Sequence, residues 1–92
     1  MTAIDLDRIT AEAVADANTV SRQTPETSLT SLRRYALITK LSGHTLRELK
    51  DALTLPEMVA ERGRLGRPLV KNDYVNILTS KALRSLTEPV SN

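Results

Sequence analysis

The sequence contains no cysteine, no phenylalanine and no tryptophan, and Tyr35 and Tyr74 are its only aromatic side chains. The lack of cysteine excludes disulfides, thiolate metal sites and thiol nucleophiles. Because each large aromatic ring would bury roughly 150–250 Å², their scarcity leaves Leu, Ile, Val and Ala to build the core. A chain of 92 residues forms one domain at most and buries a limited share of its surface, so we expect it to gain further burial as a homodimer.

Long apolar runs are also lacking. No segment approaches the ~18 apolar residues that span a bilayer, which argues against a membrane-spanning helix. Residues 1–5 include an acidic side chain, Asp5, and no apolar stretch of the kind that signal peptides contain. We therefore expect a cytoplasmic protein, of a bacterium or of a phage that infects one.

Charge is unevenly spread along the chain. Residues 1–30 hold five acidic side chains against two basic ones, a net charge of −3. Residues 31–92 hold eleven basic side chains against six acidic ones, a net charge of +5. An acidic head on a basic body indicates different contact preferences for the two parts, although ordinary surface variation produces similar splits.

The apolar pattern predicts an all-α fold, a compact bundle of four to five short helices. The first helix is expected over residues 5–17. Its apolar residues fall on one helical face, at Leu6, Ile9, Ala13 and Ala17. This stripe is thin and rich in alanine, so the helix is weakly held if it stands alone.

The polar residues 18–24 indicate a linker, and the next helix is expected to begin at its end. Thr24 is suited to the N-cap and Pro25 to the first turn, where its missing N–H costs nothing. The helix runs to about Leu41, because Gly43 can adopt the left-handed conformation that ends helices.

Two capping boxes follow in close succession. Thr45 and Thr54 are each followed, three residues later, by a glutamate whose carboxylate can reach back to the backbone of the threonine. They predict two short helices, one over residues 46–53 and one from about residue 55 to Gly63, joined by a tight turn.

Residues 63–68 are expected to form a loop, with a short strand at 67–71 as a further possibility. Asn72 or Asp73 then caps a last helix that ends near Leu86. The whole chain divides into three parts. These are an acidic N-terminal helix with its linker (1–23), a helical core domain (24–87) and a frayed tail (88–92).

Catalytic and metal-binding patterns are scarce. His44 is the only histidine, and it lies in a turn between predicted helices, where a lone imidazole is usually solvated. A zinc site needs three or four ligands at characteristic spacings, and Gly63–Gly66 lacks the length and the Lys-Ser/Thr of a phosphate-binding loop. We therefore expect no enzymatic activity, no metal site and no cofactor.

Basic side chains gather over residues 62–71, where Arg62, Arg64, Arg67 and Lys71 are interleaved with Gly and Pro. A Gly-rich basic loop can follow a phosphate backbone closely, and Arg favours a narrow minor groove. The Gly-Arg-Pro sequence around Arg67 is similar to the core of an AT-hook, which implies binding in the minor groove. A solvated loop with unpaired arginines is the alternative.

Residues 46–62 resemble the helix-turn-helix of bacterial regulators. Leucine fills the apolar positions beside the turn, at Leu49, Leu53 and Leu55. The resemblance implies that the second helix enters the major groove of DNA. In that arrangement Arg47 and Lys50 add phosphate contacts, whereas the alternative is that these cations line the solvated faces of amphipathic helices.

Two functions remain open from the sequence. The first is a small regulatory or accessory protein that binds DNA through the helix-turn-helix-like region and the 62–71 loop. The second is a protein-interaction module, such as an adaptor, an inhibitor of a larger enzyme, or a phage or secretion assembly component, that contacts its partner through aliphatic helix faces. In the second case Leu6 and Ile9 of the acidic N-terminal helix are the predicted docking residues.

Overall fold

The structure is a computed structural model that describes residues 4–87. All regular structure in this range is helical, which confirms the predicted all-α class. The helices are α1 (Leu6–Ser21), α2 (Leu29–Ser42), α3 (Leu46–Asp51), α4 (Leu55–Leu65) and α5 (Lys71–Thr87). No strand occurs among the described residues, so the short strand considered at 67–71 does not form. The predicted frayed tail, 88–92, lies outside the described residues.

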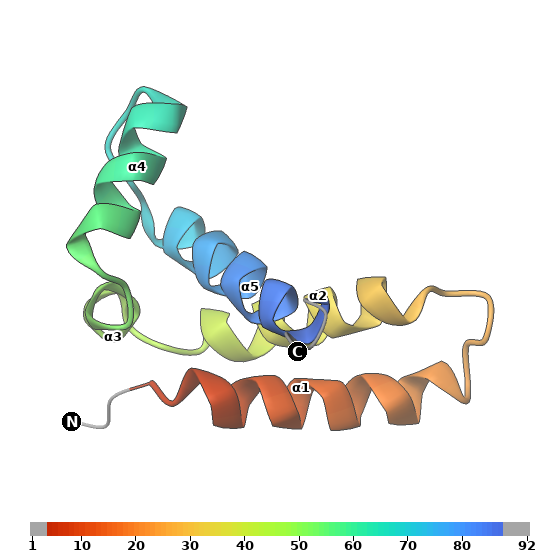
Figure 1. The fold of residues 1–92 in the computed structure, drawn as a ribbon. Helices are drawn as coiled ribbons and strands as arrows, with labels where there is room; N and C mark the ends of the chain where they lie inside the picture. The colour runs from red at the N-terminus through yellow and green to blue at the C-terminus, as the bar shows by residue number, and fades with distance from the viewer. Residues whose placement is uncertain (1–3, 88–92) are drawn as a thin grey trace, which may run out of the picture.

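Helices α1 and α2 run antiparallel, side by side, and α5 lies across α2 (Figure 1). Helix α3 sits at one end of this layer and packs on α5. Helix α4 stands away from the layer at the same end. The radius of gyration is 14.1 Å, larger than the roughly 12 Å expected for a compact domain of this length, which agrees with a helix that projects from the body.

The core is aliphatic, as the scarcity of aromatic residues predicts, with one exception: Tyr74 is 5% exposed and belongs to the buried cluster. The fully buried large side chains come from α2, α3 and α5. They include Leu37, Leu41, Leu49 and Leu78. Ile9 and Ala13 of α1 belong to the same buried cluster. Helix α1 is therefore a component of the core, and its alanines allow it to lie close to α2.

The start of α2 differs from the prediction. Ser28, not Thr24, is the N-cap, and its hydroxyl accepts a hydrogen bond from the backbone N–H of Ser31 at 3.1 Å. Thr24 instead closes the end of α1, because both its hydroxyl and its backbone N–H donate to the carbonyl of Val20 at 3.0 Å. Helix α1 therefore extends to Ser21, and Pro25 lies in the connecting turn.

Both predicted capping boxes are confirmed. The carboxylate of Glu48 accepts a hydrogen bond from the backbone N–H of Thr45 at 2.9 Å, and Glu57 does the same with Thr54 at 2.9 Å. These backbone hydrogen bonds lower the pKa of both glutamates below the ordinary value of 4.5. Two separate helices joined by a tight turn follow from this local chemistry.

The end of α4 lies further along the chain than predicted. The helix continues through Gly63 and ends at Leu65, with Gly66 in the left-handed conformation at φ 70°. Gly66 is the only residue with positive φ within the described range. Of the two glycines, Gly66 is therefore the left-handed cap, and Gly63 lies inside the last turns of α4.

Substitution of the two glycines tests whether Gly66, and not Gly63, ends α4. Gly66→Ala should destabilise the end of α4 by about 1 kcal/mol, because an L-residue is strained at positive φ. Gly63→Ala should stabilise the helix by a similar amount, about 1 kcal/mol, since alanine is the better helix former. A Cβ at either position meets no atom within 4 Å, so sterics do not obscure the comparison. Amide hydrogen exchange along α4 measures both effects, and equal protection in the two variants would contradict the assignment.

Candidate interaction surface

Helix α4 buries none of its residues, in contrast to the helices around it. Leu55 is 70% exposed and Val59 is 61% exposed. These residues lie one turn apart and Arg62 continues the same stripe, since positions i, i+4 and i+7 share a helical face. The face of α4 that points away from the body is therefore apolar, with a cation at its end.

A cleft of about 500 Å³ lies beside this stripe. Leu55 and Val59 line it from α4, and Pro68 and Leu69 line it from the segment that follows α4. Tyr74 of α5 also lines it and is buried, whereas Leu69 is only partly buried against the core. The cleft is thus an apolar groove between an exposed helix and an irregular segment, the arrangement in which an amphipathic helix docks.

Charged side chains border the apolar groove. Lys50 and Asp51 come from α3 and Arg62 comes from α4. All three residues are exposed, and none makes an ion pair or side-chain hydrogen bond with another of the described residues. Two of the three charges are positive, so the border of the groove has a net charge of +1.

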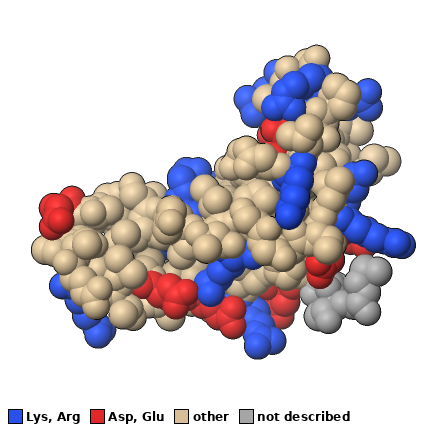
Figure 2. All heavy atoms as spheres, turned by 180° about the vertical axis from the view of Figure 1, so that it is seen from behind, with Lys and Arg blue, Asp and Glu red and all other residues tan. Residues whose placement is uncertain are grey.

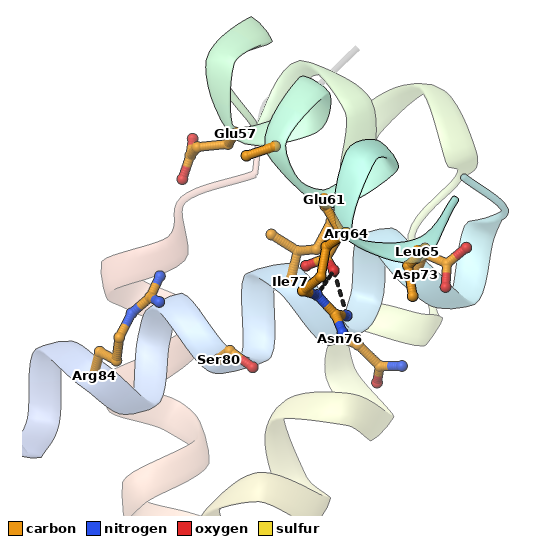
Figure 3. Close-up of a pocket in the computed structure, with 10 residues that line it drawn as sticks. Glu57, Glu61, Arg64, Leu65, Asp73, Asn76, Ile77, Ser80 and Arg84 are labelled. Carbon is orange, nitrogen blue, oxygen red and sulfur yellow. Dashed lines mark hydrogen bonds and ion pairs between the residues drawn. The ribbon is translucent and has the colours of Figure 1, made fainter. Parts of the chain in front are cut away.

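The opposite face of α4 is turned toward α5 and carries charged side chains beside Ala60 and Leu65. Glu57 forms an ion pair with Lys81 of α5 at 3.1 Å, and Glu61 pairs with Arg64 within α4. Glu57, Glu61 and Arg64 line a second cleft of about 450 Å³ between the two helices, and Asn76 lines it from α5 (Figure 3). The glutamates of α4 are therefore directed away from the exposed apolar stripe.

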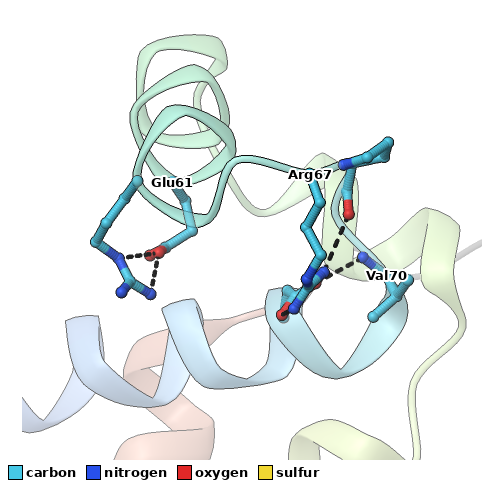
Figure 4. A network of polar contacts seen from close by, with 6 residues as sticks. Glu61, Arg67 and Val70 are labelled. Carbon is cyan, nitrogen blue, oxygen red and sulfur yellow. Dashed lines mark hydrogen bonds and ion pairs between the residues drawn. The ribbon is translucent and has the colours of Figure 1, made fainter.

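A fork between Arg67 and Asp73 ties the loop after α4 to the first turn of α5 (Figure 4). Two guanidinium nitrogens donate to the two carboxylate oxygens at 2.7 and 3.0 Å, and the backbone N–H of Val70 donates to the same carboxylate at 2.8 Å. These hydrogen bonds, with that of Arg67 the largest cause, lower the pKa of Asp73 from 3.8 to about 2. The fork holds the segment that forms one wall of the apolar groove.

The fork should make the stability of the protein depend on pH. The carboxylate of Asp73 is fully charged above its ordinary pKa of 3.8, and its contribution to folding is lost as the pH falls through about 2. We expect Asp73→Asn to lower the urea midpoint at neutral pH, and the gap from the wild type to close between these two values. Asp51→Asn, at an exposed residue without a partner, is the control, and a gap that persists at the lowest pH would contradict the ionic origin.

The six predicted DNA-binding residues divide into two groups. Arg64, Arg67 and Lys71 are engaged within the protein, since Lys71 Nζ donates to the carbonyl of Ser42 at 3.1 Å. The other three, Arg47, Lys50 and Arg62, are exposed and without a partner among the described residues. The guanidinium of Arg67 lies on Asp73 and donates to the Pro68 carbonyl, so it does not extend freely as the AT-hook resemblance implies.

The resemblance to a helix-turn-helix is partial in three dimensions. Leu49 and Leu53 are buried beside the turn, but Leu55 is exposed, which corrects the expectation for that position. In a helix-turn-helix the second helix packs against its neighbours, whereas α4 presents its apolar stripe to solvent. The proposed docking residues of α1 are engaged as well, since Ile9 is buried and Leu6 packs against the core.

Sequence reasoning missed the apolar groove. Its signal was present in the spacing of Leu55 and Val59, but α4 also carries Met58, Ala60 and Leu65, and spacing alone does not show which face meets the core. Pro68 and Leu69 complete the groove only because the Arg67–Asp73 fork folds the loop back toward α5.

The described residues form neither a metal-binding cluster nor a membrane-spanning helix. No three of their His, Cys, Asp or Glu side chains come together as metal ligands would. None of their helices has both the length and the apolar character to cross a bilayer. No protein-family model matches the chain, and no curated protein or solved structure matches it.

Proposed function

We propose that this protein is a non-enzymatic interaction module that binds a larger protein through the apolar face of α4. The observation that carries the proposal is the exposure of Leu55 and Val59 on a helix that buries no residue. Contiguous exposed apolar surface beside a groove is a feature of binding sites.

The energetics of α4 agree with a docking role. Isolated helices of this length, 11 residues, are marginal in water, and most helices are stabilised by packing an apolar face. Here the capping box, the left-handed Gly66 and the Glu57–Lys81 ion pair hold the helix in place while its apolar stripe stays uncovered. A partner that covers Leu55 and Val59 would supply the missing packing.

Site-specific photo-crosslinking tests the proposal. A photoreactive amino acid at position 59 should form adducts with a protein in an extract of the source organism, and nuclease treatment should leave the adducts unchanged. The same amino acid at position 35 is the control, because Tyr35 is 74% exposed on α2, outside the groove. Equal crosslinking at the two positions, or none at position 59, would show that the groove is not a protein-binding site.

Binding to DNA is a second candidate function, favoured by the basic side chains that gather over α4 and beside it (Figure 2). Arg47, Lys50 and Arg62 are free to contact phosphates, and the glutamates of α4 are turned toward α5, where they do not oppose a nucleic acid. Glutamates that faced the DNA would repel its phosphates, so this orientation is compatible with the helix-turn-helix hypothesis.

A mobility-shift titration at low salt separates the two functions. If the protein binds DNA through three phosphate contacts, affinity should fall with salt at a logarithmic slope of roughly −3. Arg62→Ala should then reduce that slope by about 1, whereas Arg22→Ala, an exposed arginine outside the groove, should not. A duplex that is not retarded at low salt would eliminate this second function.

A further inference from the structure

We infer that the segment of the partner that occupies the α4 groove is an acidic amphipathic helix, with aliphatic side chains along one face and carboxylates beside them. This inference rests on the proposed function and specifies the chemistry of its partner. Its basis is the juxtaposition of an apolar floor with the unpaired cations Lys50 and Arg62 at the border of the same groove.

The groove has the composition that an aliphatic helix face requires. Its walls are formed by Leu55, Val59, Leu69 and Pro68. Its one aromatic lining residue, Tyr74, is buried. A volume of about 500 Å³ accommodates several aliphatic side chains from one helix. A helix inserts such residues at i, i+3, i+4 and i+7, which places its remaining residues against the border of the groove.

The cations at the border of the groove determine which charge the partner should carry beside its apolar stripe. Lys50 and Arg62 reach the groove from two different helices, so they lie beside an inserted helix at two separate points. Aspartate or glutamate at the matching positions would pair with them, whereas lysine or arginine would be repelled. Asp51 contributes the only negative charge at the border, and the net charge of +1 favours an acidic partner.

A second copy of this chain fits the groove less well. The acidic helix of this protein, α1, has its apolar face in the core, with Ile9 and Ala13 buried, so it cannot also fill a neighbour's groove. In a two-fold symmetric pair the same patch would meet itself, which would bring Lys50 and Arg62 of both copies to one interface. A DNA backbone fits less well again, because it would cover Leu55 and Val59 with phosphates.

A displayed peptide library tests the inference on the full-length protein. Each peptide would carry a fixed aliphatic stripe on a helical frame, and the positions beside the stripe would be randomised. The Leu55→Ser/Val59→Ser double variant serves as the counter-selection, since its substitutions remove only exposed side chains. We expect the recovered peptides to contain several-fold more Asp and Glu than Lys and Arg beside the stripe.

A charge swap then identifies the cations involved. The double variant Lys50→Glu/Arg62→Glu should bind a recovered acidic peptide roughly tenfold more weakly, the effect of losing two exposed charge pairs and adding repulsion. The same peptide with its acids replaced by lysine should regain affinity for this variant. The matched control Arg22→Glu/Arg34→Glu reverses two exposed cations outside the groove and should leave affinity unchanged.

The possible outcomes are distinct. Recovered peptides without an acidic preference, or an unchanged affinity after the charge swap, would overturn the inference, while crosslinking at position 59 would still support the proposed function. A dimer in light scattering that dissociates in the Leu55→Ser/Val59→Ser variant would overturn it in favour of a second copy. Retardation of a DNA duplex that depends on Lys50 and Arg62 would overturn it in favour of a nucleic acid.

Discussion

Leu78→Ala should lower the free energy of unfolding by about 3 kcal/mol, within the range measured for leucine-to-alanine changes in closely packed cores. Leu78 is fully buried, on the helix that contacts α2 and α3. The loss combines the transfer free energy of the deleted methyl groups with the cavity that a rigid core leaves behind. Because small domains have only about 5–15 kcal/mol of stability, this single change removes a large fraction of it.

Urea unfolding followed by circular dichroism measures this effect, and Leu55→Ala is the matched control. Both variants delete the same atoms, but Leu55 is 70% exposed and lines only the open groove. Surface changes of this type shift stability by less than about 0.5 kcal/mol. A loss at Leu55 equal to that at Leu78 would mean that α4 is buried in solution, by a second copy or otherwise, and would contradict the exposed position that the structure gives it.

The double variant Leu55→Ser/Val59→Ser should weaken binding of the protein partner by at least about 2 kcal/mol, roughly thirtyfold in Kd. Side chains near the centre of an interface carry most of the binding energy, because they are fully desolvated when the partner binds. Folding should be nearly unaffected, since neither residue contributes to the core. This separation of binding from stability is the result that distinguishes a docking surface from a structural face.

Quantitative pull-down of the partner captured by crosslinking measures the loss, and circular dichroism confirms that the variant is folded. Tyr35→Ser is the control for removal of an exposed apolar side chain, because Tyr35 lies on α2 and does not line the groove. Equal loss of binding in the control would indicate that the partner covers a much wider surface. Full binding by the double variant would assign the interaction to another face.

Local signals in the sequence identified most helix boundaries. Thr45 and Thr54 begin helices where their capping boxes predict, because those hydrogen bonds join residues only three positions apart. The helix ends were less accurate where two candidate residues compete. Thr24 precedes a proline and looks like a helix start, yet it closes the preceding helix through Val20. Thr24 could form hydrogen bonds in either role, at the start of α2 or at the end of α1, and tertiary packing decides between them.

The composition and the spacing of apolar residues were sufficient to determine an all-α fold with an aliphatic core, because helix caps and periodicity depend on near neighbours in the chain. The orientation of α4 was not determined in this way. If the helix had turned its apolar stripe inward, Leu55 and Val59 would be buried and Glu57 would be exposed to solvent. The tertiary structure decides the matter through the Glu57–Lys81 and Arg67–Asp73 contacts with α5. These contacts join residues 24 and 6 positions apart. They leave Leu55 and Val59 exposed because α5 holds the face of α4 that carries Glu57.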